Sequence, residues 1–155
     1  MAAAIVDESL PPALLRALPA QGLQPDSATF FHTQLTLNQL YYLAEGNLLG
    51  LGPAVQAVTA RYRAGRGEAR VIVVKYPVAA AARAARDRFV TTYLEARSAT
   101  PDPVVRRTEG RTYAGVLANA PYLLLVMDAP HAASVKALLA RVKDGLQGTT
   151  HARPR

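Results

Sequence analysis

The strongest restriction on the fold comes from two strand-like runs joined by a short glycine-containing turn. Residues Val55–Arg63 alternate between the two faces of a half-buried strand. The sequence Ala64-Gly-Arg-Gly67 then supplies turn residues, and Glu68–Tyr76 returns as a run rich in valine and isoleucine. This pattern predicts a β-hairpin.

A long helix is predicted directly after this hairpin. Pro77 stands where the first turn of a helix favours proline, and Pro101 and Pro103 end the helical pattern. Apolar side chains recur every three or four residues, so that they line one face of the helix. These side chains are Val78, Ala82, Ala85, Phe89, Tyr93 and Ala96.

A second group of strands and a second helix follow. Turns at Glu109-Gly110 and Asn119-Ala-Pro121 separate three short runs and predict a meander. The second helix begins near Pro130, and Gly145 or Gly148 marks the end of its narrow apolar stripe. The three strands of the meander are Val104–Arg107, Arg111–Ala118 and Tyr122–Met127.

The two helix starts resemble each other in sequence. Aligned without a gap, Pro77–Phe89 and Pro130–Val142 share a proline, three alanines and an arginine, with Arg83 matched by Lys136. Each start also follows a strand of buried type, which favours a duplicated hairpin-helix unit. The alternative is a chance match, because two amphipathic helices rich in alanine and arginine agree in part by composition alone.

These elements predict an α+β fold with a mostly antiparallel sheet of about five strands and two long helices on one face. Both helices are placed on one face because each has a single apolar stripe, and because the strands alternate enough to leave the other face polar. At 155 residues, a single domain is expected.

The predicted domain spans residues 29–148. Residues 1–28 form a lead-in with a short helix around Pro11–Leu18. Thr29–Thr33 fits a short strand, whereas Leu35–Leu43 has no clean period and is assigned no type. The basic segment 149–155 is expected to be disordered.

Composition and spacing exclude several kinds of site. The chain has no cysteine, which rules out disulfides, thiolate nucleophiles and cysteine-bound metals. The histidines His32, His131 and His151 do not lie three or four residues apart, so they form no helical metal clip. Asp128, His131 and Ser134 cluster at a helix start, and we interpret them as helix-start residues rather than a catalytic triad. We predict no catalytic residue, no metal and no cofactor.

The net charge indicates the kind of partner. The chain carries 18 lysine and arginine residues against 11 aspartate and glutamate residues, a net charge of +7. This excess favours acidic partners such as nucleic acid, anionic lipid or an acidic protein surface. The longest apolar runs, Val71–Val74 and Tyr122–Met127, are far shorter than the roughly 20 residues of a membrane span.

The densest basic cluster lies on the predicted hairpin. Arg61, Arg63, Arg66 and Arg70 surround one turn, against the single acidic residue Glu68. Alternation puts Arg61 and Arg63 on one face, with Arg66 at the tip. Such a ribbon can follow a phosphate backbone, but any solvated sheet face also carries charge, and no platform of stacking aromatic residues accompanies these arginines.

A second candidate site is the glycine-rich loop before the hairpin. It lacks the Lys-Ser/Thr pair of a P-loop and a helix that follows it, so a turn-rich connection is favoured over phosphate binding. His32, Asn47, Gly50 and Gly52 are the candidate residues here, for the case of an enzyme whose functional residues are dispersed.

A resemblance to a known family rests on six short segments: Ala17–Ser27, Phe31–His32, Asn47–Gly52, Ala60–Arg63, Val73–Ala81 and Tyr113–Val116. They resemble a bacterial family of uncharacterised proteins, a domain of unknown function. In that family such segments form the C-terminal half of a longer, usually exported protein. The resemblance spans about residues 10–145 and implies a periplasmic or exported setting, but its turn and strand signatures carry no activity to transfer.

The chain differs from that family in being basic and in lacking a recognisable N-terminal half. Its first residues show no signal peptide, so a cytoplasmic protein is the alternative to one from which a signal was removed.

We therefore expect a non-enzymatic protein-interaction domain, an accessory or structural subunit of a larger assembly. It would bind other protein subunits through its sheet or an edge strand, and a homo-oligomer is compatible with this hypothesis. The second hypothesis is a nucleic-acid-binding module that uses the arginine-rich hairpin 61–70. An enzyme is the third.

Overall fold

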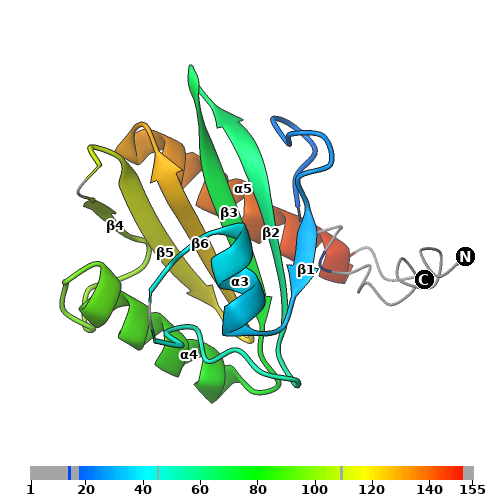
Figure 1. The fold of residues 1–155 in the computed structure, drawn as a ribbon, viewed down its shortest axis with the longest axis vertical. Helices are drawn as coiled ribbons and strands as arrows, with labels where there is room; N and C mark the ends of the chain where they lie inside the picture. Colours follow the sequence, from blue (N-terminus) through cyan, green and yellow to red (C-terminus); the bar gives the residue numbers. More distant parts are fainter. Residues whose placement is uncertain (1–13, 15–17, 45, 109, 152–155) are drawn as a thin grey trace, which may run out of the picture.

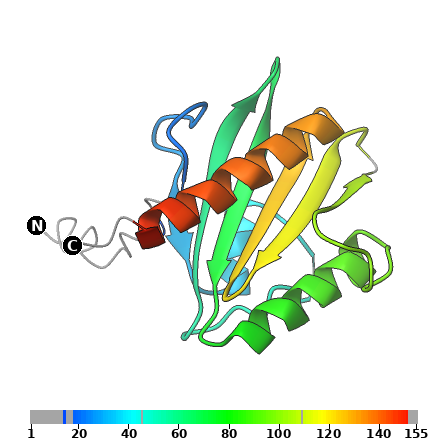
Figure 2. The ribbon, with the colours of Figure 1, turned by 180° about the vertical axis from the view of Figure 1, so that it is seen from behind.

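The computed structural model describes residues 14, 18–44, 46–108 and 110–151. It shows one six-stranded antiparallel sheet with helices on both faces (Figures 1 and 2). The order across the sheet is β1-β2-β3-β6-β5-β4, so β3 and β6 are the central strands. The strands are β1 (Thr29–Phe31), β2 (Gln56–Ala64), β3 (Gly67–Lys75), β4 (Val104–Arg107), β5 (Tyr113–Asn119) and β6 (Tyr122–Ala129).

The antiparallel hairpin and the meander are confirmed. Strands β2 and β3 pair along their whole length, from Gln56 opposite Lys75 to Ala64 opposite Gly67. Gly65 has a φ of 60°, and a two-residue hairpin turn of type II′ needs a positive φ at its first position, which glycine adopts without strain. Strands β4, β5 and β6 are sequential antiparallel neighbours.

The sheet has one strand more than the expected five. Strand β1 pairs with β2, with Thr29 opposite Thr59 and Phe31 opposite Ala57. The expected five counted only the hairpin and the meander, whereas β1 lies in Thr29–Thr33, the segment that fitted a short strand. After it comes helix α3 (Gln34–Leu40), in the segment to which the sequence assigns no type, and the hydroxyl of Thr33 caps its first turn.

Of the two helices expected to be long, only the second is. Helix α4 (Ala79–Arg88) has ten residues and continues as a π-helical turn, η1 (Phe89–Tyr93). Helix α5 (Ala132–His151) has 20 residues. None of the described helices is both long and apolar enough to cross a membrane.

Each face of the sheet carries its own hydrophobic core. Ala82, Ala85 and Phe89 place α4 and η1 over one face, which they share with α3. Val135 and Leu139 place α5 over the opposite face, as Figure 2 shows. The prediction that both helices lie on one face is therefore wrong.

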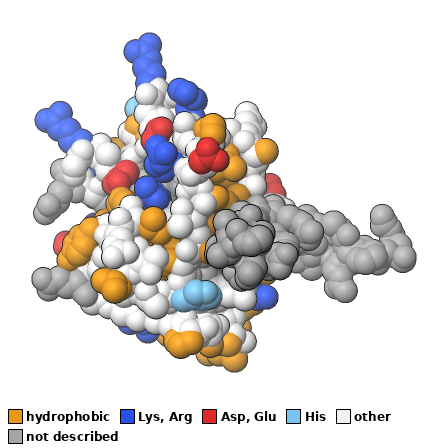
Figure 3. Space-filling view, turned by 45° about the vertical axis from the view of Figure 1, so that its right-hand side comes forward, with side chains coloured by type: hydrophobic (Ala, Val, Ile, Leu, Met, Phe, Trp, Pro, Cys, Tyr) orange, Lys and Arg blue, Asp and Glu red, His pale blue; other side chains and the backbone are white. Residues whose placement is uncertain are grey.

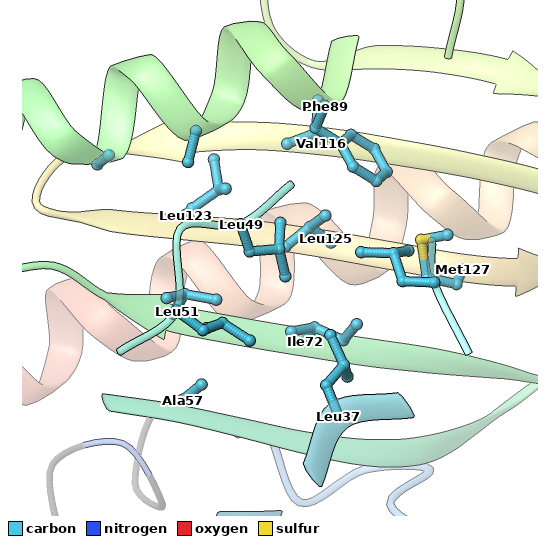
Figure 4. Close-up of a cluster of buried hydrophobic side chains, with 14 of the residues drawn as sticks. Leu37, Leu49, Leu51, Ala57, Ile72, Phe89, Val116, Leu123, Leu125 and Met127 are labelled. Carbon is cyan, nitrogen blue, oxygen red and sulfur yellow. The ribbon is translucent and has the colours of Figure 1, made fainter. Parts of the chain in front are cut away.

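The central strands explain why both faces need a cover. Val71–Val74 and Leu123–Met127 are uninterrupted apolar runs, and all of their side chains are buried. Successive side chains of a strand point to opposite faces, so such runs are typical of strands that are buried on both sides. Figure 4 shows the core on the α4 face, where strand side chains meet those of α3, η1 and the loop before β2: Ile72, Leu125, Leu37, Phe89 and Leu49.

The duplicated hairpin-helix unit is not confirmed. If the two units were copies of one structure, a rotation would superpose them. The strand order allows one: a twofold axis normal to the sheet, between the antiparallel strands β3 and β6, would place the β2–β3 hairpin on the β5–β6 hairpin. That rotation would leave the two helices on the same face. Because α4 and α5 lie on opposite faces, the two units have opposite hand.

The described part of the lead-in runs along β2. The carbonyl oxygen of Gly22 accepts a 2.8 Å hydrogen bond from the N–H of Arg63, and the N–H of Gln24 donates to the carbonyl of Arg61 at 2.9 Å. This pairing covers the outer edge of β2 beyond the end of β1.

The predicted ends of the chain fall partly outside the described residues. The short helix expected around Pro11–Leu18 lies largely outside them, although Leu14 and Leu18 are buried in the core on the α5 face. Helix α5 extends into the predicted tail as far as His151, and residues 152–155 are not described.

Candidate interaction site

The arginines predicted as an interaction surface lie on the β2–β3 hairpin, whose turn projects beyond the rest of the sheet (Figure 1). Arg61 lies opposite Arg70, and Arg63 lies opposite Glu68. Residues opposite one another in an antiparallel pair share a face, and alternation from Ile72 puts these four on the α4 face. Arg66 is in the turn. We call the surface formed by Arg61, Arg63, Arg66, Glu68 and Arg70 the hairpin face.

Two of the four arginines have partners within the chain. Arg61 forms an ion pair of 3.3 Å with Glu68, and both side chains are about half exposed. Arg70 donates a 3.1 Å hydrogen bond to the hydroxyl of Thr59, which itself donates to the carbonyl of Val71 at 3.0 Å. These contacts hold the two directly opposed cations, Arg61 and Arg70, in defined positions despite their like charge.

Arg70 also packs on an aromatic ring. Its guanidinium carbon lies 5.3 Å from the centroid of the Tyr41 ring, a cation–π distance. Burial and the neighbouring Arg61 lower the pKa of Arg70, while Tyr41, Asp128 and Glu68 act in the opposite direction. An arginine remains protonated throughout the physiological range, so Arg70 is a fixed, half-buried cation at this site.

A cluster of polar side chains supports this cation from three separate elements. Tyr41 follows α3, Tyr93 ends η1, and Asp128 lies near the end of β6. Burial raises the pKa of Tyr41, and the charges of Tyr93 and Asp128 and hydrogen bonding with both raise it further. Tyr93 stacks on Phe89, with ring centroids 4.9 Å apart. The Tyr41 phenol is thus a protonated donor fixed beside a carboxylate.

Sequence reasoning did not find the cluster of Tyr41, Tyr93 and Asp128. Two local features there are uncommon: Asp128 has a φ of 61°, and Tyr93 belongs to a π-helical turn. Both features recur at functional sites, but neither leaves a pattern that can be read from residue spacing. Tyr42, which follows Tyr41 in the chain, is 59% exposed and adds an aromatic surface at the end of α3.

The remaining two arginines, Arg63 and Arg66, are exposed, and within the described chain neither forms an ion pair. Figure 3 shows lysine and arginine side chains toward the end of the molecule from which the hairpin projects, with acidic side chains among them. The hairpin face is therefore a surface of interleaved charge rather than an uninterrupted basic strip.

The residues of the candidate loop site form separate local contacts. His32 Nδ1 lies 2.8 Å from the carbonyl oxygen of Val55. The amide side chain of Asn47 bonds both the N–H and the carbonyl of Leu51 at 2.9 Å. Neither His32 nor Asn47 lines the cavities beside β4, beside α4 or at the paired ends of β2 and β3.

Of the candidate glycines of this loop, Gly50 lies in a packed position. Gly50 has a φ of 63°, and a Cβ there would come within 2.8 Å of a guanidinium nitrogen of Arg88. Arg88 also donates a 3.0 Å hydrogen bond to the carbonyl of Leu48. Between these polar contacts Leu49 enters the core (Figure 4), whereas a Cβ at Gly52 would meet only open space.

One buried charge was not identified from the sequence. Arg86 is 8% exposed and pairs with Asp102 at 3.0 Å and with Asp87 at 2.9 Å. It also donates to the carbonyls of Ser98 and Thr100, so it fastens the loop between η1 and β4 to helix α4. All of these partners belong to the loop or the helix, which indicates a structural role.

Across the described residues, no three His, Asp or Glu side chains are grouped in a way that would hold a metal ion. In comparisons with protein-family models, curated proteins and solved structures, no significant match to the chain was found. The resemblance read from the short sequence segments therefore stays a prediction, and the site is interpreted from its own geometry.

Proposed function

We propose that the chain is a non-enzymatic protein-interaction domain, an accessory or structural subunit that binds another protein through the hairpin face. The observation that carries this proposal is the interleaving of charge: Arg61 pairs with Glu68, and Arg70 is held by Tyr41 and Thr59. Arg63 and Arg66 remain as exposed cations beside them.

This arrangement fits a protein surface better than a phosphate backbone. A nucleic acid presents negative charge at regular short intervals, so the carboxylate of Glu68 in the hairpin face and that of Asp128 near Arg70 would oppose it. A protein partner can place its own cations opposite these carboxylates and its acidic groups opposite Arg63 and Arg66. Complementary charge of this kind sets the specificity and the rate of protein association.

The test is mild native purification of the tagged chain from the cells that produce it. We expect a protein partner to be retained by the unaltered chain and by a charge-matched control, Arg83→Ser with Arg97→Ser, whose side chains are exposed away from the hairpin. The variant Arg63→Ser with Arg66→Ser should lose that partner.

Nuclease treatment and a salt series distinguish the two classes of macromolecule. If the retained material is removed by nuclease, and if its binding falls steeply with the logarithm of salt concentration, the nucleic-acid hypothesis replaces ours. A chain that purifies as a monomer with no partner contradicts the proposal.

A further inference from the structure

Strand β4 is an edge strand of the sheet. A cavity of about 370 Å³ lies on each of its two faces. The first, which we call the η1 cavity, is lined by Tyr93 and Glu95 together with Arg106 and Arg107 of β4. The second, the α5 cavity, lies between β4, β5 and the start of α5. Its lining includes Val105, Tyr113 and Lys136, and Arg106 lines this cavity as well.

The backbone of β4 is paired on one side only. Its partner is β5, in a register that puts Arg106 opposite Ala114. In the same register the N–H of Thr108 donates to the carbonyl of Thr112 at 2.7 Å. This bond shows which residues of β4 form hydrogen-bonded pairs with β5 and which form the non-hydrogen-bonded pairs between them. Val104 and Arg106 therefore direct their backbone groups toward β5, and Val105 and Arg107 direct theirs outward. No strand of the described chain lies on that outer side.

Charge decides which kind of strand fits this edge. If β4 paired with β4 of a second chain, the exposed side chains of Arg106 and Arg107 would lie directly or diagonally opposite the same arginines of that chain. Like charges directly opposite each other destabilise a strand pair, and such charges are a common means of preventing self-association at edges. An acidic strand instead complements Arg106, Arg107 and Lys136. Among the described residues that line the two cavities, Glu95 is the one acidic side chain.

We propose that β4 accepts an extended acidic segment of a partner protein as a seventh strand. Alternate side chains of that segment point to opposite faces, so one set enters the η1 cavity and the other enters the α5 cavity. Acidic side chains fit the η1 cavity, where Arg106 and Arg107 lie, and branched apolar side chains fit the α5 cavity beside Val105 and Tyr113. This surface is separate from the hairpin face.

The test uses three labelled synthetic peptides and fluorescence polarisation at low salt. The probe alternates glutamate and valine, Gly-Glu-Val-Glu-Val-Glu-Val-Gly. One control replaces each glutamate with lysine, and the other keeps the composition but loses the alternation, Gly-Glu-Glu-Glu-Val-Val-Val-Gly. We expect the alternating acidic peptide to bind at least about tenfold more tightly than either control peptide. Equal binding of the scrambled peptide overturns it.

A proline substitution tests the backbone contact. Arg107→Pro removes an outward N–H that is not needed for pairing with β5, and edge strands tolerate proline at such a position. Its matched control is Arg107→Ala, which removes the same charge but keeps the N–H. The proline variant should bind the probe about fivefold more weakly than the alanine variant, or more weakly still, because it loses a backbone hydrogen bond and blocks the edge. Equal binding by the two variants contradicts strand addition.

Two further variants keep the test decisive if the Arg107→Pro variant does not fold. Arg106→Glu should reverse the preference, so that the lysine peptide binds better than the glutamate peptide; an unchanged preference overturns the proposal. Arg63→Ser with Arg66→Ser should bind the probe like the unaltered chain, which separates this site from the hairpin face. If the unaltered chain forms dimers that Arg107→Pro abolishes, a second copy is the occupant and the proposal fails.

Discussion

The guanidinium carbon of Arg70 lies 5.3 Å from the centroid of the Tyr41 ring, although the two residues come from different layers of the fold. Arg70 is on a central strand, and Tyr41 follows the helix that covers that strand. The contact joins the hairpin to the segment after α3. As a result, one cation of the hairpin face is fixed before any partner arrives, which lowers the conformational entropy lost on binding.

The hydroxyl of Tyr41 should contribute measurably to stability. Tyr41→Phe keeps the ring beneath Arg70 but removes the hydroxyl that interacts with Asp128 and Tyr93. We expect the free energy of unfolding in urea to fall by about 1 kcal/mol. The control is Tyr42→Phe, at an exposed neighbour, which should change it by less than about 0.5 kcal/mol. Equal effects at the two positions would show that the Tyr41 cluster adds nothing.

The buried tyrosines predict a loss of stability in alkali. Burial raises the pKa values of Tyr41, Tyr62, Tyr76 and Tyr93 above the ordinary value of 10.0. As the pH rises, the unfolded chain therefore loses these protons first. Stability is then full below about pH 9 and falls as the pH rises beyond about 10.

The measurement for this prediction is a joint titration of tyrosinate absorbance and circular dichroism. The absorbance from the buried phenols should appear together with the loss of dichroism, whereas in concentrated urea all seven tyrosines should titrate near pH 10. Complete tyrosinate formation while the dichroism is still native would contradict the raised pKa values.

The buried Arg86 should be among the most sensitive charged positions. Arg86→Met removes the partner of Asp102 and leaves the carbonyls of Ser98 and Thr100 without this donor. We expect a loss of about 2 kcal/mol in the free energy of unfolding, because these carbonyls and the Asp102 carboxylate lose a charged hydrogen-bond donor. The control is Arg83→Met on the exposed face of the same helix, which should cost less than about 0.5 kcal/mol. A similar loss for both variants would contradict the structural role of Arg86.

The contact between Gly115 and α5 predicts a size limit at that position. A Cβ at Gly115 would lie 2.5 Å from Cγ1 of Val135 and 3.0 Å from the carbonyl oxygen of Val104. Gly115→Ala should therefore destabilise the chain by about 1–3 kcal/mol, measured by urea unfolding.

Two companion variants examine the cause of that loss. Gly52→Ala is the control, since a Cβ there meets nothing within 4 Å, and it should be close to neutral. Adding Val135→Ala to Gly115→Ala should cost less than the sum of the two single changes, because the second change relieves the clash. Strict additivity would show that the contact with Val135 is not the cause.

The parts of the fold that depend on local pattern were predictable from the sequence. The β2–β3 hairpin rests on alternation and on a glycine turn, and both signals lie within 22 residues of chain, from Val55 to Tyr76. The face of the sheet that each helix covers was not predictable from the sequence, because an amphipathic helix fits either face. The apolar runs Val71–Val74 and Leu123–Met127 did carry the signal for burial on both faces, and alternation in the outer strands obscured it.

The candidate site was predictable in part for a similar reason. Alternation placed Arg61 and Arg63 on one face, and the register confirms this. Alternation cannot show that Tyr41, Tyr93 and Asp128 meet beside Arg70, because their approach depends on tertiary packing across distant elements. The outward backbone groups of β4 likewise depend on the ladder with β5 and not on side-chain chemistry.

The most direct test of the proposed interaction is photo-crosslinking in the cells that produce the protein. A photoreactive amino acid replaces Arg66 at the hairpin turn in one chain and the exposed Arg83 on α4 in the control chain. We predict one discrete protein adduct from position 66 that resists nuclease, is removed by protease and does not form from position 83. No adduct from position 66, the same adduct from both positions, or an adduct that nuclease removes would contradict it.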